Sequence, residues 1–190
     1  MCADDEPSLI ERARGGDRAA FGQLVGRHQD RIFATLVRTL GSTADAEDVA
    51  QTTFLLAWRK LGQFRAEAKL STWLTQIAVN QAASLRRKRK PPTTLNTEDG
   101  PMPVEDDRAA TASHRMEAAE RDALVQSAIN RLSAEHREVL VLKEFGEHDY
   151  REISEIVGCP VGTVRSRLHR ARSELSDLLA PHRESLVAVS

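Results

Sequence analysis

The sequence has few aromatic residues and few glycines, which argues against a protein built from β-sheets. Of its 190 residues, 4% are aromatic and ten are glycine, while alanine, leucine, arginine and glutamate are abundant. These abundant residues favour helices, whereas sheets are usually rich in aromatic and β-branched side chains. We therefore expect an all-α fold with one or two small domains.

Cysteine pairs, long apolar runs and excess charge are also absent from the sequence. Cys2 and Cys159 have neither CxxC spacing nor histidines nearby, so we expect no disulfide framework, metal site or cofactor. No apolar run reaches the length of a membrane span and the first residues are acidic, so we expect a cytoplasmic protein without membrane insertion. The net charge of −1 excludes a uniformly basic surface, and any DNA affinity must come from local clusters.

One break in composition divides the chain. The stretch from about Lys90 to Ser113 contains four of the seven prolines and almost no large apolar residues, so it cannot offset its ordering entropy by burial. The segment from Pro91 to Ser113 contains five acids and one arginine, and this negative charge disfavours contact with DNA. The sequence thus predicts helical domains at 1–90 and 115–182, joined by a flexible acidic linker at 91–114 and followed by a tail at 183–190.

Hydrophobic periodicity and helix-start residues predict the helices within these domains. They are expected at 8–13, 18–40, 43–61 and 72–88 before the linker, and at 115–131, 134–145, 150–157 and 160–179 after it. The start signals are pairs with capping-box spacing, single N-cap candidates and a proline suited to a first helical position: Ser42 with Asp45, Asp149 with Glu152, Ser71, Ser133 and Pro160.

The last predicted helix has one apolar stripe and one basic, hydroxyl-bearing face. The stripe consists of Val161, Val164, Leu168, Ala171 and Leu175. The opposite face consists of Gly162, Thr163, Ser166, His169, Arg170 and Ser173, flanked by Arg165, Arg167 and Arg172. Upstream, Ser154, Gly158 and Val164 have the spacing of a helix-turn-helix. A helical hairpin with solvated arginines is the alternative, but the short hydroxyl side chains favour a recognition helix in a major groove.

The helix that ends in "RRKRK" has a second unusual surface. Trp73, Gln76, Asn80 and Arg87 fall on one side of it, opposite a core stripe of apolar residues. An indole can stack on an unpaired base, amides can hydrogen-bond to base edges, and the basic end can hold phosphates. The alternative is that Trp73 packs as a half-buried amphipathic residue and that the basic run is a solvated helix end.

The helix at 43–61 carries an outward face made of Asp48, Gln51, Thr52, Leu55 and Arg59. Single surface leucines are common and need no explanation. A leucine surrounded by an acid, an amide and an arginine is nevertheless typical of the middle of a protein contact. Leu55 therefore marks a candidate protein interface.

Together these segments resemble the bacterial RNA polymerase sigma factors of the extracytoplasmic-function class, in the sigma-70 family. The stretch "DAEDVAQTTFLLAWRKLGQFRAEAKLSTWLTQIAVNQA" resembles sigma region 2, and "LSAEHREVLVLKEFGEHDYREISEIVGCPVGTVRSRLHRAR" resembles region 4. Region 4 motifs occur in other helix-turn-helix regulators, but region 2 followed by region 4 is specific. The resemblance covers nearly the whole chain and implies promoter-specific transcription initiation.

The resemblance also implies roles for individual residues. Core polymerase binding, at the clamp helices of the largest subunit, falls to Asp45, Asp48, Gln51 and Leu55, with Thr52 standing where many members have glutamate. Recognition and melting of the −10 element falls to Trp73, Gln76, Asn80 and Arg87, with the loop 64–70 expected to hold a flipped base. Contact with the −35 element falls to Thr163, Arg165, Ser166, His169 and Arg170, with Arg167 and Arg172 on phosphates or in a structural role.

The implied partners are core polymerase, including the flap of its second-largest subunit, promoter DNA and, as is common in the family, an anti-sigma factor. A DNA-binding regulator that never contacts polymerase is the alternative, although it leaves the faces around Trp73 and Leu55 without a role. We expect no enzyme, because no nucleophile, base and orienting group form a recognisable motif and no Gly-rich phosphate loop occurs.

Overall fold

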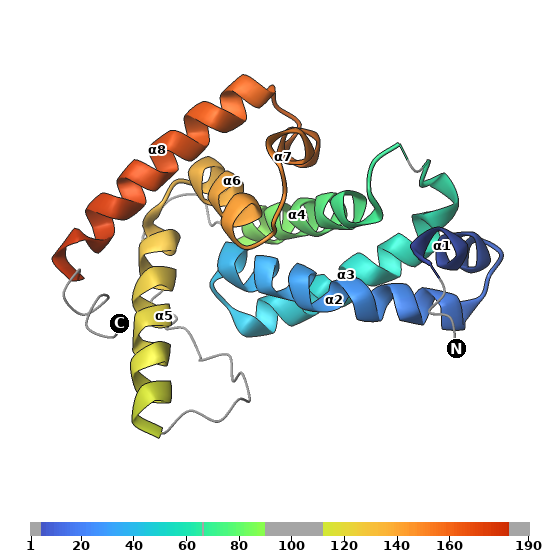
Figure 1. Cartoon of the computed structure of the whole chain (residues 1–190), viewed down its shortest axis with the longest axis horizontal. Coiled ribbons are helices and arrows are strands. Elements are labelled where there is room, and N and C mark those ends of the chain that lie inside the picture. The colour runs from blue at the N-terminus through green and yellow to red at the C-terminus, as the bar shows by residue number, and fades with distance from the viewer. Residues whose placement is uncertain (1–4, 66, 90–111, 183–190) are drawn as a thin grey trace.

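The structure is a computed structural model that describes residues 5–65, 67–89 and 112–182, with the side chains of 112–117 excepted. The regular secondary structure of this part is entirely helical, as Figure 1 shows. The all-α prediction is confirmed. Much of the predicted linker and the predicted tail lie outside the described residues.

The N-terminal helices pack around one core. They are α1 (Glu6–Arg14), α2 (Arg18–Leu40), α3 (Thr43–Lys60), the short η1 (Leu61–Gln63) and α4 (Leu70–Arg89). Helices α2 and α3 lie along one another, α4 packs on both of them, and α1 covers one end of α2 (Figure 1). Fully buried Leu24, Ile32, Leu36 and Leu61 belong to this core.

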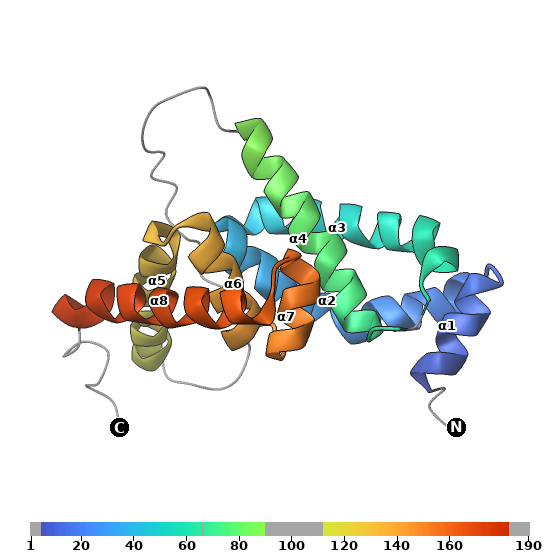
Figure 2. The same ribbon diagram turned by 90° about the horizontal axis from the view of Figure 1, so that it is seen from above.

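The C-terminal helices pack around a second core. They are α5 (Ala112–Arg131), α6 (Ala134–Glu144), α7 (Tyr150–Val157), α8 (Val161–Leu179) and the short η2 (Ala180–His182). The buried Ile129, Leu140, Ile153 and Leu168 come from all four long helices. Helix α8 extends along one side of this unit, as Figure 2 shows from above.

The helix ends agree with most of the sequence signals. The predicted bounds of α2 and α7 match the structure, and Asp149 with Glu152 forms a complete capping box. Ser42 accepts from the backbone N–H of Asp45 without a reciprocal bond. Ser133 caps α6 in the predicted way.

Four start positions differ from the predictions. Helix α1 begins at Glu6, two residues before the predicted start. Helix α4 begins at Leu70, so Ser71 lies inside it and is no cap. Pro160 is the N-cap of α8 and does not occupy its first helical position. Helix α5 begins at Ala112, three residues before the predicted start, because the short side chains there give no sharp start signal.

The two helical units touch along two zones. Helix α4 lies against α7, and the C-terminal end of α2 lies against α5 and α6. Val79 of α4 is buried within the second core. This contact between units determines which surfaces remain exposed.

Candidate nucleic-acid and protein interfaces

Helices α7 and α8 form the predicted helix-turn-helix. Gly158 ends α7 in the left-handed region with φ of 68°, which glycine adopts without the steric cost of a Cβ. The Ser154 hydroxyl donates to the Cys159 carbonyl at 2.6 Å, which ties the end of α7 to the turn. Val164 is fully buried in the angle between the two helices. Each of these residues has the part that the spacing predicts.

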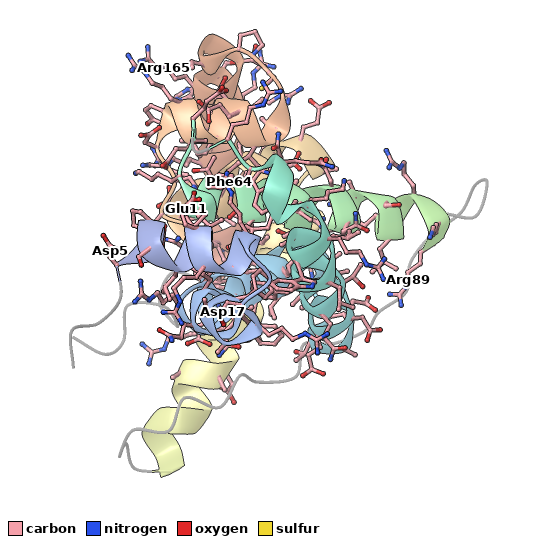
Figure 3. The ribbon with its side chains drawn as sticks, turned by 90° about the vertical axis from the view of Figure 1, so that its right-hand side faces the viewer. Asp5, Glu11, Asp17, Phe64, Arg89 and Arg165 are labelled. Carbon is pink, nitrogen blue, oxygen red and sulfur yellow. The ribbon has the colours of Figure 1, made fainter. Side chains whose placement is uncertain are left out.

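The outward face of α8 is open to solvent. Arg165, Ser166, His169 and Arg170 are exposed, and Thr163 is half-buried with its carbonyl accepting from the Ser166 hydroxyl at 3.0 Å. Arg165 projects from the edge of the molecule in Figure 3, and its Cζ lies 5.7 Å from the centre of the Tyr150 ring. Cation–π contact of this kind steadies an exposed arginine without occupying its hydrogen-bond donors. The structure thus brings the predicted −35 residues together on one surface.

The two flanking arginines are held by acids. Arg167 pairs with Glu135 at 2.7 Å, and Arg172 donates to Glu144 from Nε at 3.1 Å and from Nη2 at 2.7 Å. The hydrogen bond to Glu144 raises the pKa of the Arg172 guanidinium above its ordinary value. Both acids come from α6, so these pairs fix α8 on α6. The positions of Arg167 and Arg172 support the structural role that the sequence left open.

The predicted −10 surface of α4 is split by the neighbouring unit. Trp73 is half-buried, with its ring 5.2 Å from that of Phe64. Gln76 donates from Nε2 to the backbone carbonyl of Glu155 in α7 at 3.0 Å. Asn80 and Arg87 remain exposed. Two of the four residues are therefore free, and two are engaged.

The basic end of α4 is only partly available. Arg87, Lys88 and Arg89 are all exposed, but Arg89, which lies at the far end of α4 in Figure 3, also pairs with Asp45 of α3. Lys90 lies outside the described residues. Asp45 is itself buried and does not belong to the outward face of α3. The structure thus places Asp45 apart from the other residues predicted to contact polymerase.

The rest of the predicted α3 face is exposed as expected. Asp48, Gln51, Thr52 and Arg59 reach solvent. Leu55 is 61% exposed and is the one large apolar side chain that is exposed in the described part of the chain. An apolar side chain held in water lowers the cost of binding a partner there. Leu55 is therefore placed as a protein contact would require.

Beside Leu55 lies an apolar groove that sequence reasoning missed. Helices α2 and α3 enclose an open volume of about 770 Å³, lined by Phe21, Phe33, Phe54 and Trp58 among others. The Phe21 and Trp58 rings lie 4.9 Å apart. Most of the eight aromatic residues therefore gather near one groove or near Trp73. The signal in the sequence was this clustering of a scarce residue type on two adjacent helices.

Other kinds of site find little support in the part of the chain that the structure describes. No group of three or more His, Cys, Asp or Glu residues within it could hold a metal ion. None of the helices described is long and apolar enough to cross a membrane. Cys159 is a free, half-buried cysteine.

Comparison with known proteins matches both units to one family. The family description "Sigma-70 region 2" matches residues 24–91, and "Sigma-70, region 4" matches residues 122–175. RNA polymerase sigma-H factor of Pseudomonas aeruginosa is 37% identical over 95% of this chain and 97% of its own length. ECF RNA polymerase sigma-E factor of Haemophilus influenzae is 34% identical over 93% of this chain and 96% of its own.

Solved structures give the same result. CnrH in complex with the cytosolic domain of CnrY has a TM-score of 0.70 at 30% identity, covering 94% of this chain and 99% of that one. The sigma factor RpoE in complex with the anti-sigma factor NepR from Bartonella quintana has a TM-score of 0.65 at 26% identity, covering 84% and 96%. The chain belongs to the extracytoplasmic-function class of the sigma-70 family, the promoter-directing subunits of bacterial RNA polymerase.

Proposed function

We propose that this sigma factor binds core RNA polymerase through the α2–α3 face and promoter DNA through α8 and α4. The observation that carries the proposal is the separation of these surfaces. An exposed basic face on α8 would suffice for a simple DNA-binding regulator, but the exposed Leu55 and the aromatic groove beside it lie on the other unit. A regulator that does not bind polymerase has no use for them.

Polymerase binding is assigned to Leu55, Asp48 and Gln51 with the adjoining groove. Leu55 supplies an apolar anchor, and the acid and amide beside it can pair with polar groups at the rim of a contact. The groove adjoins Leu55, and one helix of a partner can bind in it. Thr52 is exposed in the same face and offers a hydroxyl where many members of the family have a carboxylate.

Reading of the −35 element is assigned to the exposed face of α8. Arg165 and Arg170 can each make paired hydrogen bonds with guanine in a major groove, and Ser166 and His169 can contact bases or phosphates. Arg167 and Arg172 hold the helix to α6.

Reading of the unpaired −10 strand is assigned to Trp73, Gln76, Asn80 and Arg87, together with the loop 64–70. The Trp73 ring lies 5.2 Å from that of Phe64 at a tilt of 43°, a contact that supports the indole for stacking on a base. Asn80 and Arg87 offer an amide and a cation further along α4. The chain acts by binding, without catalysis, and its place of action is the cytoplasm, where polymerase transcribes. An anti-sigma partner is proposed from the RpoE relative, whose solved complex contains one.

A charge-and-size variant of the α3 face tests the proposal. Asp48→Arg combined with Leu55→Glu should abolish co-purification with core polymerase and run-off transcription while helicity is kept, because both side chains are exposed. Gln23→Arg, at an exposed position of α2 outside the groove residues, is the matched control and should bind normally. Core binding by the double variant at the level of the control would overturn the assignment.

A further inference from the structure

The last residue of α1, Arg14, contacts the turn that precedes α4. Its guanidinium carbon lies 5.9 Å from the centre of the Phe64 ring, and its Nε donates to the Leu61 carbonyl at 3.4 Å. The same carbonyl accepts from the Phe64 backbone N–H at 3.1 Å, which closes the turn η1. One arginine therefore contacts both ends of the segment 61–64.

Phe64 in turn contacts Trp73, the aromatic residue assigned to the −10 strand. Phe64 is 5% exposed, and its ring centre lies 5.2 Å from that of Trp73. Tilted aromatic pairs at this distance attract one another beyond the effect of their buried area. Trp73 is half-buried, so the position of the Phe64 ring limits the orientations open to the indole.

Helix α1 is held along α2 at both of its ends. Near its start, Glu6 Oε2 lies 3.0 Å from Nε2 of His28 in α2. Near its end, Arg12 pairs with Asp17, the N-cap of α2, at 2.8 Å. Leu9 is fully buried in the core between these two contacts. The helix thus gives Arg14 a fixed base.

An acid on the same helix orients the guanidinium. Nη1 of Arg14 donates to the Glu11 carboxylate at 2.6 Å, and Figure 3 views the molecule from this side, with Glu11 and Phe64 labelled. The Arg14 side chain is 27% exposed and that of Glu11 is 71% exposed. Ion pairs this exposed add little to stability. The contacts of Arg14 therefore matter for orientation, and the residue can be replaced without unfolding the chain.

We propose that Arg14 is a positioning residue for −10 recognition. It holds Phe64, and Phe64 holds the Trp73 indole in the orientation that stacks on an unpaired base. The inference deepens the proposed function and rests on the assignment of Trp73 to the −10 strand. Helix α1, to which the sequence assigns no role, thereby takes part in strand binding.

The effect on affinity follows from the fraction of chains in which the indole already has the stacking orientation. The apparent affinity is reduced by that fraction, so a less ordered indole binds the strand more weakly. Loss of a cation–π contact at an exposed site should weaken strand binding about two- to fivefold. Loss of the indole itself should weaken it by more, about 5- to 140-fold.

The test compares full-length chains with Arg14→Ala, with Trp73→Ala and with both changes. Fluorescence anisotropy of a labelled single-stranded DNA pool of random sequence gives each dissociation constant. Arg14→Ala should weaken binding about two- to fivefold, and should add little in the Trp73→Ala background because it acts through that indole. Arg27→Ala, which removes the same charge from an exposed position of α2, should leave binding nearly unchanged.

A spectroscopic measurement follows the indole directly. The chain has two tryptophans, so Trp58→Phe leaves Trp73 as the one fluorescent indole. In that background, Arg14→Ala should lower the anisotropy of the Trp73 emission and increase its quenching by acrylamide. Circular dichroism should show unchanged helicity. A general loss of structure would lower the helicity as well.

The outcomes separate the positioning role from its alternatives. Unchanged strand binding by Arg14→Ala, or an indole that is no more mobile in that variant, would overturn the proposal. The full Arg14→Ala effect in the Trp73→Ala background would also overturn it, because Arg14 would then contact the strand itself. Undiminished binding by Trp73→Ala would instead remove the α4 assignment on which the proposed function depends.

Discussion

Helices α4 and α8 are both assigned to DNA, but they differ in how much of the assigned surface reaches solvent. Four assigned contacts of α8 are exposed: Arg165, Ser166, His169 and Arg170. On α4, Gln76 is bonded to α7 and Trp73 lies half-buried on Phe64. In this conformation the assigned −35 face of α8 is exposed, whereas part of the assigned −10 face of α4 is in contact with the rest of the chain.

The difference follows from how each helix uses its apolar residues. Helix α8 has one apolar stripe, which packs against the core, so its opposite face makes no packing contacts. Helix α4 has buried residues on its core stripe and also Thr75 and Val79 beside it, so two of its sides are covered. A helix that packs against two units has less surface left for a ligand.

The largest expected effect comes from breaking the support of α8. Leu168→Ala removes a buried side chain from the second core and should lower the free energy of unfolding by about 2–5 kcal/mol. Chemical denaturation measures this loss. Ser173→Ala, an exposed change on the same helix, should leave stability nearly unchanged. Equal stability of the two variants would show that α8 is not held by its apolar stripe.

A smaller effect tests the reading face of α8 itself. Arg165→Ala should cost about 1–3 kcal/mol of discrimination at particular bases, the value of one guanidinium–guanine contact. Arg172→Ala should instead weaken the tie to Glu144 and leave the preferred sequence unchanged. Selection from a randomised duplex library measures both. A preferred sequence that survives Arg165→Ala unaltered would contradict the assignment.

The smallest expected effect is on pH dependence. Burial lowers the pKa of His148 and of His28 below the ordinary 6.5, and Glu6 opposes this at His28. His148 lies before α7 and faces Glu152 of α7, Arg31 of α2 and Lys69 before α4. Because the folded chain prefers the neutral rings, stability is fully present above about pH 6.5 and falls as the pH decreases from there.

Thermal unfolding at about pH 7.5 and about pH 5.5 measures this effect. The melting temperature should fall toward the acid side, and His148→Gln should make the fall shallower. A wild-type melting temperature that rises on acidification would contradict the burial of neutral histidine between the units.

The sequence predicts individual helices well because periodicity and caps are local. Gly158 and Val164 occupy the expected places in the turn, and Asp149 with Glu152 forms the expected box. The match of α2 at both ends has the same local cause.

Contacts between segments distant in the chain were the part that the sequence did not reveal. Arg89 pairs with Asp45 from 44 positions away, and Gln76 bonds to Glu155 from 79 positions away. Such distant pairings produce no periodic pattern in the sequence. Val79 was the available clue, because an apolar residue beside the core stripe needs a second partner. The groove between α2 and α3 likewise forms only when aromatic residues from two helices meet.

The most direct test links α7 to the start of α4 and asks which DNA the linked chain still binds. Carbodiimide coupling can join Lys69 to Glu152 across their 2.9 Å ion pair, and Lys69→Arg keeps the charge but cannot form that amide. Peptide mapping identifies the linked chain, which is then titrated with −35 duplex and with the −10 single strand. The account predicts unchanged duplex binding together with loss of strand binding and of run-off transcription. A linked chain that binds the strand and initiates transcription as well as the uncoupled Lys69→Arg control would contradict it.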